Sequence, residues 1–178
     1  SNRCREILKK LSLNPNIEDR FFDYNVSIND YINEIVRSFQ EISNKKFFVN
    51  KENYKNIILI SKSTEIIYGL RNFIGNANKF SKNKIDIFLT SNKKSTNILI
   101  KDDGPGFPKD LIDKDTLGEP YIRTIDKENI SKHGLGLGTF IGKTLLEKNF
   151  ANIKFKNSIN KGGAEVLIEW DNRDLNKI

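Results

Sequence analysis

The sequence predicts an α/β (α+β) two-layer sandwich, in which helices cover one face of a mixed, mostly antiparallel sheet. Two observations support this fold class. Segments with apolar residues at helical spacing alternate along the chain with short segments rich in β-branched and aromatic residues. Most of the short segments occur in pairs separated by a few turn-forming residues, a pattern typical of hairpins and therefore of antiparallel strands.

One globular domain with a short appendage is expected from the 178 residues, of which 37% are hydrophobic. No apolar run is long enough to cross a bilayer. The formal net charge is +7, but the 30 lysines and arginines are scattered along the chain and accompany no nucleic-acid-binding motif. We therefore expect no nucleic acid partner and keep a basic nucleic-acid-binding module only as a remote alternative. The single cysteine, Cys4, excludes an intrachain disulfide.

The N-terminal part predicts a short helix, a linker and the first long helix. Residues 3–11 carry apolar side chains on one helical face, which predicts a helix that packs on a partner. Residues 12–26 are mostly polar and predict a linker whose aromatic pair docks on the domain. Ser27 with Asp30 three residues later resembles a capping box, and the apolar spacing that follows predicts a helix to about Ile42.

The middle of the chain predicts two strands, a second long helix and a hairpin. The short apolar runs Phe47–Val49 and Asn56–Ile60 suit strands. From Ser63 to Phe80 the apolar spacing is helical again. Lys84–Thr90 and Thr96–Lys101 are rich in β-formers and are separated by a polar turn, which predicts the two strands of a hairpin.

The last part predicts a long loop, a third long helix and a second hairpin. Residues 107–133 contain prolines and many charges, and only Lys109–Ile112 suits a short helical turn. A loop of this length inside a compact domain is usually functional or mobile. Thr139–Lys148 has helical spacing, and Asn152–Asn157 and Ala164–Trp170 predict the two strands of the hairpin.

Three spaced motifs carry the functional information. The first, from Leu70 to Ser81, reads LRNFIGNANKFS and places Asn72, Asn76 and Lys79 at positions i, i+4 and i+7 of the predicted helix. One helical stripe therefore carries two amides and an ammonium beside an apolar face. The amide oxygen of Asn76 suits Mg²⁺, and Lys79 is one turn further on, within reach of the same phosphates. Taken alone, the two amides are equally consistent with polar helix residues in an asparagine-rich chain.

The second motif follows a predicted strand and reads DDGPG, from Asp102 to Gly106. A carboxylate at a strand end can accept a hydrogen bond from an exocyclic amine such as that of adenine. An Asx turn before Gly104 is the alternative explanation for Asp102. Gly104 and Gly106 allow the backbone to approach a flat ring, because no Cβ intervenes.

The third motif, GLGLG from Gly134 to Gly138, joins a glycine-rich loop to a helix start, where free backbone N–H groups favour phosphate. Its spacing differs from the dinucleotide fingerprint GxGxxG, and the sequence contains no GxxxxGK[ST] motif. No Cys and His spacing typical of a metal centre accompanies the motifs. Together, the three motifs predict a nucleotide site.

The order of these motifs, NxxxNAxKFS, DxGxG and GLGLG, resembles the N, G1 and G2 boxes of the GHKL ATPase superfamily. More specifically, it resembles the catalytic ATP-binding domain of bacterial sensor histidine kinases, over roughly Ser27 to Trp170. The segments RCREIL, LGEPY, GLGLGTFIGKTLLEK and GGAEVLIEW are similar to the RegB/PrrB group of redox-responsive kinases. The resemblance implies the Bergerat fold, ATP and Mg²⁺ as cofactors, and protein-histidine kinase activity.

The resemblance also implies a role for each motif residue. It makes Asn76 the Mg²⁺ ligand and Asn72 and Lys79 its phosphate-side neighbours, so that these three form the catalytic set. The remaining ATP-binding positions implied are Phe80 in the nucleotide wall, Asp102 as the adenine anchor, Gly104 and Gly106 beside it, and Gly134, Leu135, Gly136, Leu137 and Gly138 around the phosphates. In hydrolytic GHKL members a glutamate that activates water occupies the position of Asn72. An amide cannot act as that base, which favours transfer to a protein acceptor over hydrolysis.

The same resemblance implies an organisation for the chain and its parent protein. Residues 1–12 would end a dimerising, phosphoacceptor helical hairpin, 13–26 would be a linker, 27–171 the catalytic domain with its ATP lid at 107–133, and 172–178 a C-terminal tail. The γ-phosphate of ATP would pass to a histidine outside this chain and then to a response regulator. The parent would be a homodimer through the hairpin, anchored in the bacterial inner membrane with this domain in the cytoplasm.

Two further hypotheses remain open from the sequence. Within the same superfamily, a serine kinase of the anti-sigma type or a hydrolytic GHKL ATPase would share the three motifs. Cys4 matches the position of a cysteine linked to redox control in RegB/PrrB-like kinases, which implies a switch through an intermolecular disulfide across the dimer. An inert thiol on a packing face is the alternative for Cys4.

Overall fold

The computed structural model describes residues 25–113, 118, 137–160 and 162–178. The predictions for Cys4, Gly134, Leu135 and Gly136 lie outside these described residues, and Leu137 is described only as part of a helical backbone. The predicted helix at 3–11 and most of the predicted linker and lid also lie outside them.

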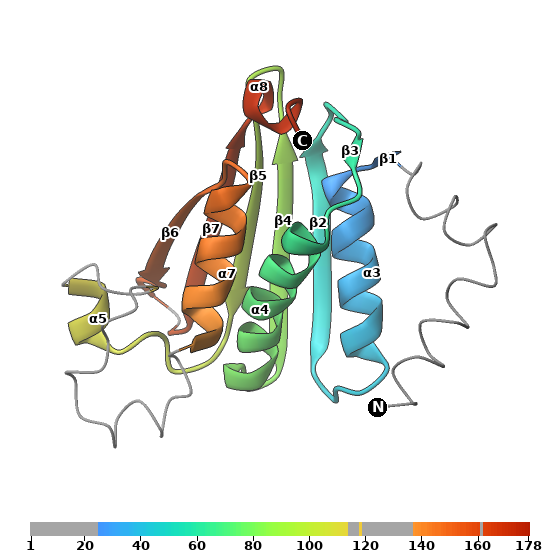
Figure 1. The fold of residues 1–178 in the computed structure, drawn as a ribbon. Coiled ribbons are helices and arrows are strands. Elements are labelled where there is room, and N and C mark those ends of the chain that lie inside the picture. Colours follow the sequence, from blue (N-terminus) through green and yellow to red (C-terminus); the bar gives the residue numbers. More distant parts are fainter. Residues whose placement is uncertain (1–24, 114–117, 119–136, 161) are drawn as a thin grey trace, which may run out of the picture.

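A five-stranded sheet forms one layer of the molecule (Figure 1). Its strand order is β2-β4-β5-β7-β6, where β2 is parallel to β4 and every other neighbouring pair is antiparallel. The strands are β2 (Lys46–Tyr54), β4 (Lys84–Ser91), β5 (Ser95–Asp102), β6 (Asn152–Asn157) and β7 (Ala164–Asp171). The sheet is therefore mixed and mostly antiparallel, as predicted.

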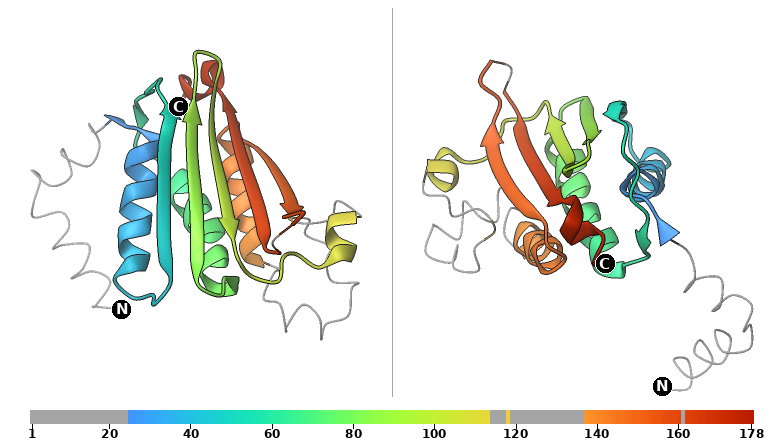
Figure 2. Two further views of the ribbon diagram at one scale, coloured as in Figure 1. Left: turned by 180° about the vertical axis from the view of Figure 1, so that it is seen from behind. Right: turned by 90° about the horizontal axis from the view of Figure 1, so that it is seen from above.

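Three long helices cover one face of this sheet, and the view from behind shows the opposite face bare of helices (Figure 2). They are α3 (Ile28–Gln40), α4 (Thr64–Phe80) and α7 (Leu137–Lys148). The buried core lies between the two layers, where the buried residues of the central strands, such as Ile87 and Ile98, face the helices. The predicted two-layer sandwich with helices on one face is confirmed.

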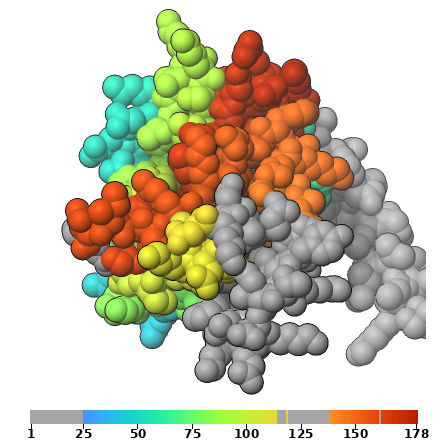
Figure 3. Space-filling view, turned by 90° about the vertical axis from the view of Figure 1, so that its left-hand side faces the viewer, coloured from blue at the N-terminus to red at the C-terminus, as the bar shows by residue number. Residues whose placement is uncertain are grey.

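Two short helices and a small sheet complete the described structure. α5 (Lys109–Asp113) packs against β6, and Figure 3 shows it next to the β6–β7 hairpin. α8 (Asn172–Leu175) follows β7 at the other end of the sheet. β1 (Asn25–Val26) pairs antiparallel with β3 (Ile60–Ser61). Among the described residues, no helix combines the length and the apolar character needed to cross a bilayer.

Local signals account for the start of α3. Ser27 is its N-cap, and the Asp30 carboxylate accepts a hydrogen bond from the Ser27 backbone N–H at 2.8 Å, while the Ser27 hydroxyl accepts one from the Asp30 N–H at 3.2 Å. This reciprocal pair satisfies donors that a helix start otherwise leaves unpaired. The predicted capping box is confirmed.

The predicted strand at Asn56–Ile60 is wrong for most of its length. β2 instead continues to Tyr54, with a register shift between Asn50 and Asn53, and only Ile60 of the predicted segment belongs to a strand. The apolar residues of the irregular segment between β2 and β3 alternate in exposure: Ile58 packs against the core, whereas Ile57 and Leu59 are exposed. Neither β1 nor α8 was predicted, because both are too short to show a periodic pattern.

Candidate nucleotide site

A pocket lies at the end of β5, where α4 ends and α7 begins. It encloses about 450 Å³ of empty space, part of which is open to solvent. Its walls are mainly apolar, and they include Phe73, Ala77 and Phe80 from α4 and Ile100, Phe155 and Val166 from the sheet. The polar side chains among its lining residues are Asn76, Asp102 and Thr139. An apolar slot with a few converging polar groups is suited to a flat, polar-edged ligand.

Asp102 reaches this pocket because of strand alternation. Thr96, Ile98 and Ile100 of β5 point into the helix-covered face, and Asp102 is the next residue of that series. Its Oδ1 accepts hydrogen bonds from the backbone N–H of Gly104 at 2.8 Å and of Ala164 at 3.3 Å. Within the described part of the chain, Oδ2 has no hydrogen-bond donor, so Asp102 is held by one oxygen and presents the other as an acceptor.

Burial raises the pKa of Asp102, because the charged form is poorly solvated there. The hydrogen bonds from Gly104 and Ala164 act in the opposite direction but do not cancel the effect of burial. The carboxylate is thus kept in surroundings that disfavour its charge. A ligand that donates a hydrogen bond to this carboxylate would therefore stabilise its charged form.

The two glycines after Asp102 are required by close packing. A Cβ on Gly104 would lie 2.2 Å from the carbonyl oxygen of Phe80, at the end of α4. Gly106 has a φ of +84°, and a Cβ there would lie 2.7 Å from Oδ1 of Asn157. No L side chain fits at either position, and the loop is therefore pressed against the end of α4 beside the pocket.

The amides of the first motif face the start of α7. The Nδ2 of Asn72 donates to the carbonyl oxygen of Tyr68 at 2.9 Å, and the Nδ2 of Asn76 donates to Oγ1 of Thr139 at 3.2 Å. A Cβ built on Gly138 would lie 3.4 Å from Oδ1 of Asn72 and 3.9 Å from Oδ1 of Asn76. Both amide oxygens are therefore directed towards the first turn of α7, and the structure brings the first motif next to Gly138, the last residue of the third motif.

This arrangement fits a hard cation bound together with phosphate. Amide oxygens are ligands that Mg²⁺ accepts, and the N-terminal turn of a helix favours phosphate oxygens. Among the described residues, no group of three or more His, Cys, Asp or Glu side chains could hold a metal ion. Phosphate oxygens and water would have to complete the coordination of an ion at these amides.

Lys79 and Phe80 lie at the C-terminal end of α4. Phe80 lines the pocket, whereas Lys79 is exposed with its Nζ 5.3 Å from the centre of the Phe80 ring. The ammonium is therefore held at the rim of the pocket by a cation–π contact. Of the predicted site residues that the structure describes, Asn76, Phe80, Asp102 and Gly106 line the pocket.

Sequence reasoning missed several residues that shape the pocket. Asn157 accepts a hydrogen bond from the Phe107 N–H at 2.7 Å and donates one to the Phe107 carbonyl at 3.0 Å. The ring of Phe107 stands edge-on to that of Phe155, 5.7 Å between centres, and both line the pocket. Thr139 contributes its buried hydroxyl. No sequence pattern marks these residues, since their partners are distant in the chain.

Asp103 differs from its neighbour Asp102 in role. Its Oδ1 accepts backbone hydrogen bonds from Lys82 at 2.7 Å, Asn83 at 3.1 Å and Lys84 at 3.3 Å. Burial raises the pKa of Asp103, but these hydrogen bonds outweigh it and leave the pKa below the ordinary value. Asp103 thus holds the turn between α4 and β4 and does not line the pocket.

A family model described as "Histidine kinase-, DNA gyrase B-, and HSP90-like ATPase" matches residues 62–174. This range is more than half of the chain and includes all three motifs. The chain belongs to this ATPase family. The pocket between α4, α7 and the sheet is therefore the candidate nucleotide site of this ATPase-family domain.

Relatives of this ATPase-family domain include two proteins named as histidine kinases. The chain is 36% identical over 105 residues to the sensor histidine kinase RegB of Cereibacter sphaeroides. The matched region covers 56% of this chain and 22% of RegB. It is 31% identical over 145 residues to the signal transduction histidine-protein kinase ArlS of Staphylococcus aureus. That matched region covers 80% of this chain and 32% of ArlS. The chain thus spans between a fifth and a third of the length of these relatives.

Solved structures of low sequence identity share the fold of this ATPase-family domain. The mycobacterial sensor histidine kinase MprB superposes with a TM-score of 0.63 at 18% identity, covering 83% of this chain and 96% of that one. The catalytic domain of histidine kinase ThkA gives 0.64 at 20% identity, covering 83% and 95%. Full-length ShkA in complex with AMPPNP gives 0.61 at 19% identity, covering 83% and 30%.

Proposed function

We propose that this chain is the ATP-binding catalytic domain of a two-component sensor histidine kinase. It would bind ATP with Mg²⁺ and present the γ-phosphate to a histidine outside this chain, from which the phosphate passes to a response regulator. The observation that carries the proposal is the orientation of the acceptor oxygens of Asp102, Asn72 and Asn76: one faces the pocket, and two face the first turn of α7. RegB and ArlS, both named as histidine kinases, support the choice of reaction.

The apolar part of the pocket would hold the adenine ring. Phe73 and Phe80 from α4 and Val166 from β7 offer flat or aliphatic surfaces to it. Oδ2 of Asp102 would accept a hydrogen bond from the exocyclic amine, because Oδ1 is already occupied by two backbone N–H groups. This contact would select a base that carries an amine donor at that edge over a base that carries a carbonyl there.

The triphosphate would extend from the ring towards the amides and the start of α7. Asn76, with Asn72 beside it, would hold a Mg²⁺ ion, and Lys79 at the rim would approach the phosphates. When bound, Mg²⁺ would neutralise charge on the phosphate oxygens. The neutral amide of Asn72 cannot act as a general base that removes a proton from water. The side chain at this position therefore favours transfer to another acceptor over hydrolysis.

The rest of the proposed organisation concerns the parent protein. Residues 27–171 would be the catalytic domain with its lid at 107–133, residues 1–12 the end of the dimerising hairpin, 13–26 a linker and 172–178 a tail. The parent would be a homodimer anchored in the bacterial inner membrane, with this domain in the cytoplasm. Redox control through Cys4 stays a prediction, which non-reducing electrophoresis of a longer protein with and without Cys4→Ser would test.

Calorimetric titration of the chain with ATP and Mg²⁺ tests the nucleotide site. We expect wild-type protein to bind and Asp102→Asn to lose at least about tenfold in affinity, because the amide would turn a donor towards the adenine amine. Asp103→Asn is the matched control: the same change one residue away, at a carboxylate that binds the α4–β4 turn, should leave affinity within about twofold. No binding by the wild type, or equal affinity of wild type and Asp102→Asn, would contradict the proposed site.

The acceptor is tested separately. Mixing the chain with a purified helical hairpin that carries the acceptor histidine should give acid-labile phosphate on histidine. Stable phosphoserine on a protein substrate would instead indicate a serine kinase, and phosphate release without an acceptor would indicate a hydrolytic ATPase.

A further inference from the structure

Thr139 is a buried hydroxyl inside the nucleotide pocket. It is the third residue of α7, it is 1% exposed, and it is one of the polar side chains that line the pocket. Its Oγ1 accepts a hydrogen bond from the Nδ2 of Asn76 at 3.2 Å. None of the three sequence motifs predicted a role for this residue.

Small residues bring Thr139 within reach of Asn76. A Cβ on Gly142 of α7 would lie 3.0 Å from the Phe73 ring and 3.2 Å from the Cβ of Asn72. A Cβ on Gly69 of α4 would lie 2.6 Å from the side chain of Leu146. The two helices therefore pack closely, and they lie side by side in Figure 1. A short side chain on one helix can then touch a short side chain on the other.

The contact anchors the Asn76 amide by its nitrogen. A primary amide has an oxygen on one side and a donating nitrogen on the other, and it can exchange them by a half turn about its terminal bond. The neighbouring Asn72 is fixed by a carbonyl oxygen, which can only accept. For Asn76, the partner in the described part of the chain is the Thr139 hydroxyl, which can donate as well as accept. Here it accepts from the Asn76 nitrogen and so leaves the amide oxygen on the side of Gly138.

We propose that Thr139 is a positioning residue that directs the Asn76 oxygen towards the metal and phosphates of the bound nucleotide. This inference rests on the proposed ATP site and goes one step further, because it assigns the orientation of the metal ligand to a residue outside the three motifs. With the hydroxyl removed, the Asn76 nitrogen would face a methyl group and lose its acceptor, so the amide would no longer be anchored with its oxygen towards the nucleotide. The effect should then appear in the Mg²⁺-dependent part of binding.

Thr139→Val is the main test, because valine keeps the shape of threonine and lacks the hydroxyl. The whole chain is titrated with ATP in the presence of Mg²⁺ and, separately, with EDTA. With Mg²⁺ we expect about a five- to tenfold loss of affinity, the size expected when one hydrogen bond that orients a ligand is lost. With EDTA we expect less than about a twofold change. Thr139→Ser, which keeps the hydroxyl, should bind within about twofold of wild type under both conditions.

Thr96→Val is the matched control. Thr96 is also 1% exposed, and its Oγ1 donates to the side chain of another asparagine, Asn172, at 2.8 Å. This pair lies at the far end of β5 from the pocket, so the same exchange removes a comparable contact away from the site. It should lower thermal stability without changing affinity for ATP under either condition.

The outcomes separate this inference from the proposed function. Unchanged affinity of Thr139→Val with Mg²⁺ would overturn the role of Thr139 and leave the ATP site standing. Equal weakening with Mg²⁺ and with EDTA, shared by Thr139→Ser, would assign Thr139 to packing alone and also overturn it. If Thr139→Val fails to fold, Thr139→Ala gives the same comparison. Failure of the wild type to bind ATP at all would overturn the proposed function itself.

Discussion

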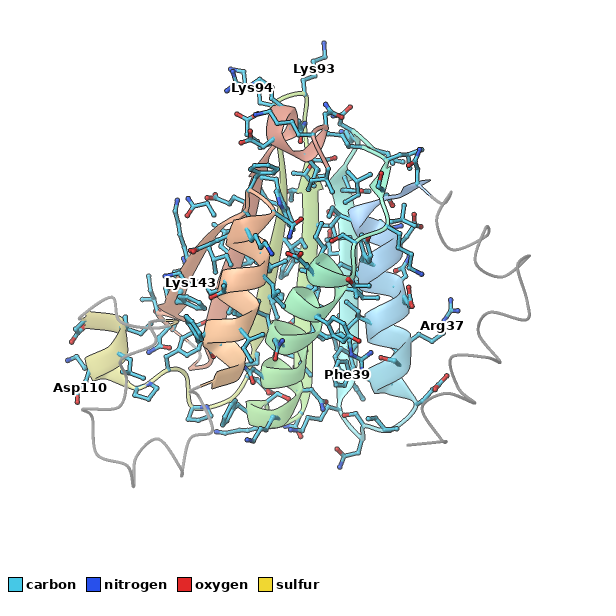
Figure 4. All side chains as sticks on the ribbon, viewed as in Figure 1. Arg37, Phe39, Lys93, Lys94, Asp110 and Lys143 are labelled. Carbon is cyan, nitrogen blue, oxygen red and sulfur yellow. The ribbon has the colours of Figure 1, made fainter. Side chains whose placement is uncertain are left out.

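The polar side chains at the two ends of strand β5 differ in how completely the protein pairs them. At the end near Lys93 and Lys94, which project from the β4–β5 turn in Figure 4, the polar groups form a closed set. Thr96 donates to Oδ1 of Asn172 at 2.8 Å, and Nδ2 of Asn172 donates to the carbonyl oxygen of Asn92 at 2.7 Å. Both sides of the Asn172 amide are therefore satisfied by the protein.

At the pocket end the polar groups are only half satisfied. Asp102 is on the same face of the same strand as Thr96, yet both of its recorded hydrogen bonds go to Oδ1. Asn72 and Asn76 use their nitrogens within the protein, and their oxygens face the start of α7. The described residues thus supply donors to one oxygen of Asp102 and acceptors to the nitrogens of both amides, and they leave acceptor oxygens for a ligand.

In this fold, a structural polar cluster differs from a candidate binding site in whether the protein pairs both sides of each polar group. A closed set contributes stability, because removing one member leaves buried partners unpaired. An open set contributes less to the stability of the empty protein, because its free oxygens have no donor within the described residues until a ligand binds. Substitutions at the far end should therefore change stability alone, and substitutions at the pocket end should change binding.

The largest effect is expected at Gly163, which joins the pocket end to β7. Its φ is +99°, and a Cβ there would lie 1.9 Å from the carbonyl oxygen of Asp102. Gly163→Ala would force apart the strands that carry Asp102 and its donor Ala164. We expect a loss of about 3 kcal/mol in the free energy of unfolding, measured by urea denaturation, together with loss of ATP binding.

Gly162→Ala is the control for this prediction. Its φ of +66° is also unfavourable for alanine, but a Cβ there would lie 3.5 Å from the Gly104 carbonyl oxygen, which is an ordinary van der Waals distance. Gly162→Ala should lower the free energy of unfolding by about 1 kcal/mol and leave ATP binding in place. Equal effects of the two substitutions would show that backbone strain, and not the contact with Asp102, controls the pocket end.

The middle effect is expected at Asn172. Asn172→Ala removes the partner of both the Thr96 hydroxyl and the Asn92 carbonyl, in a place where Asn172 is only 5% exposed. We expect the free energy of unfolding to fall by about 2 kcal/mol, with ATP affinity unchanged in calorimetry. A fall in ATP affinity at constant stability would contradict the separation of the two ends.

Much of the fold was predictable because its signals are local. The capping box at Ser27, the helical spacing of α4 and the two hairpins each lie within a short stretch of sequence. The parallel pairing of β2 with β4 and the place of β7 beside β5 join segments far apart in the chain. Such pairings depend on how the helices pack on the sheet, and no local pattern specifies them.

The site was predictable to the same extent. Asn72, Asn76 and Asp102 were found because each lies in a short motif with a chemical reason for its spacing. Thr139 and Asn157 were missed, because their hydrogen bonds join residues 63 and 50 positions apart. The motifs thus identified the polar groups of the candidate site and missed the residues that form hydrogen bonds around them.

The smallest effect on stability is expected at Asp102, and its sign is opposite to that at Asn172. Asparagine in place of Asp102 can still accept both backbone hydrogen bonds at Oδ1, and it removes a charge that burial disfavours. We expect Asp102→Asn, while losing ATP affinity, to raise the unfolding free energy of the nucleotide-free chain at neutral pH by less than about 1 kcal/mol.

The pH dependence of this gain gives the sharper measurement. The pKa of Asp102 is raised in the folded state above its ordinary value of 3.8, so its charge destabilises the fold at pH values above the folded pKa. That destabilisation is relieved as the pH falls through the folded pKa towards the unfolded value. The stability difference between Asp102→Asn and wild type should therefore shrink on acidification. A variant less stable than wild type at neutral pH would mean that Asp102 belongs to a closed structural set like that of Asn172, and the contrast between the two ends of β5 would fail.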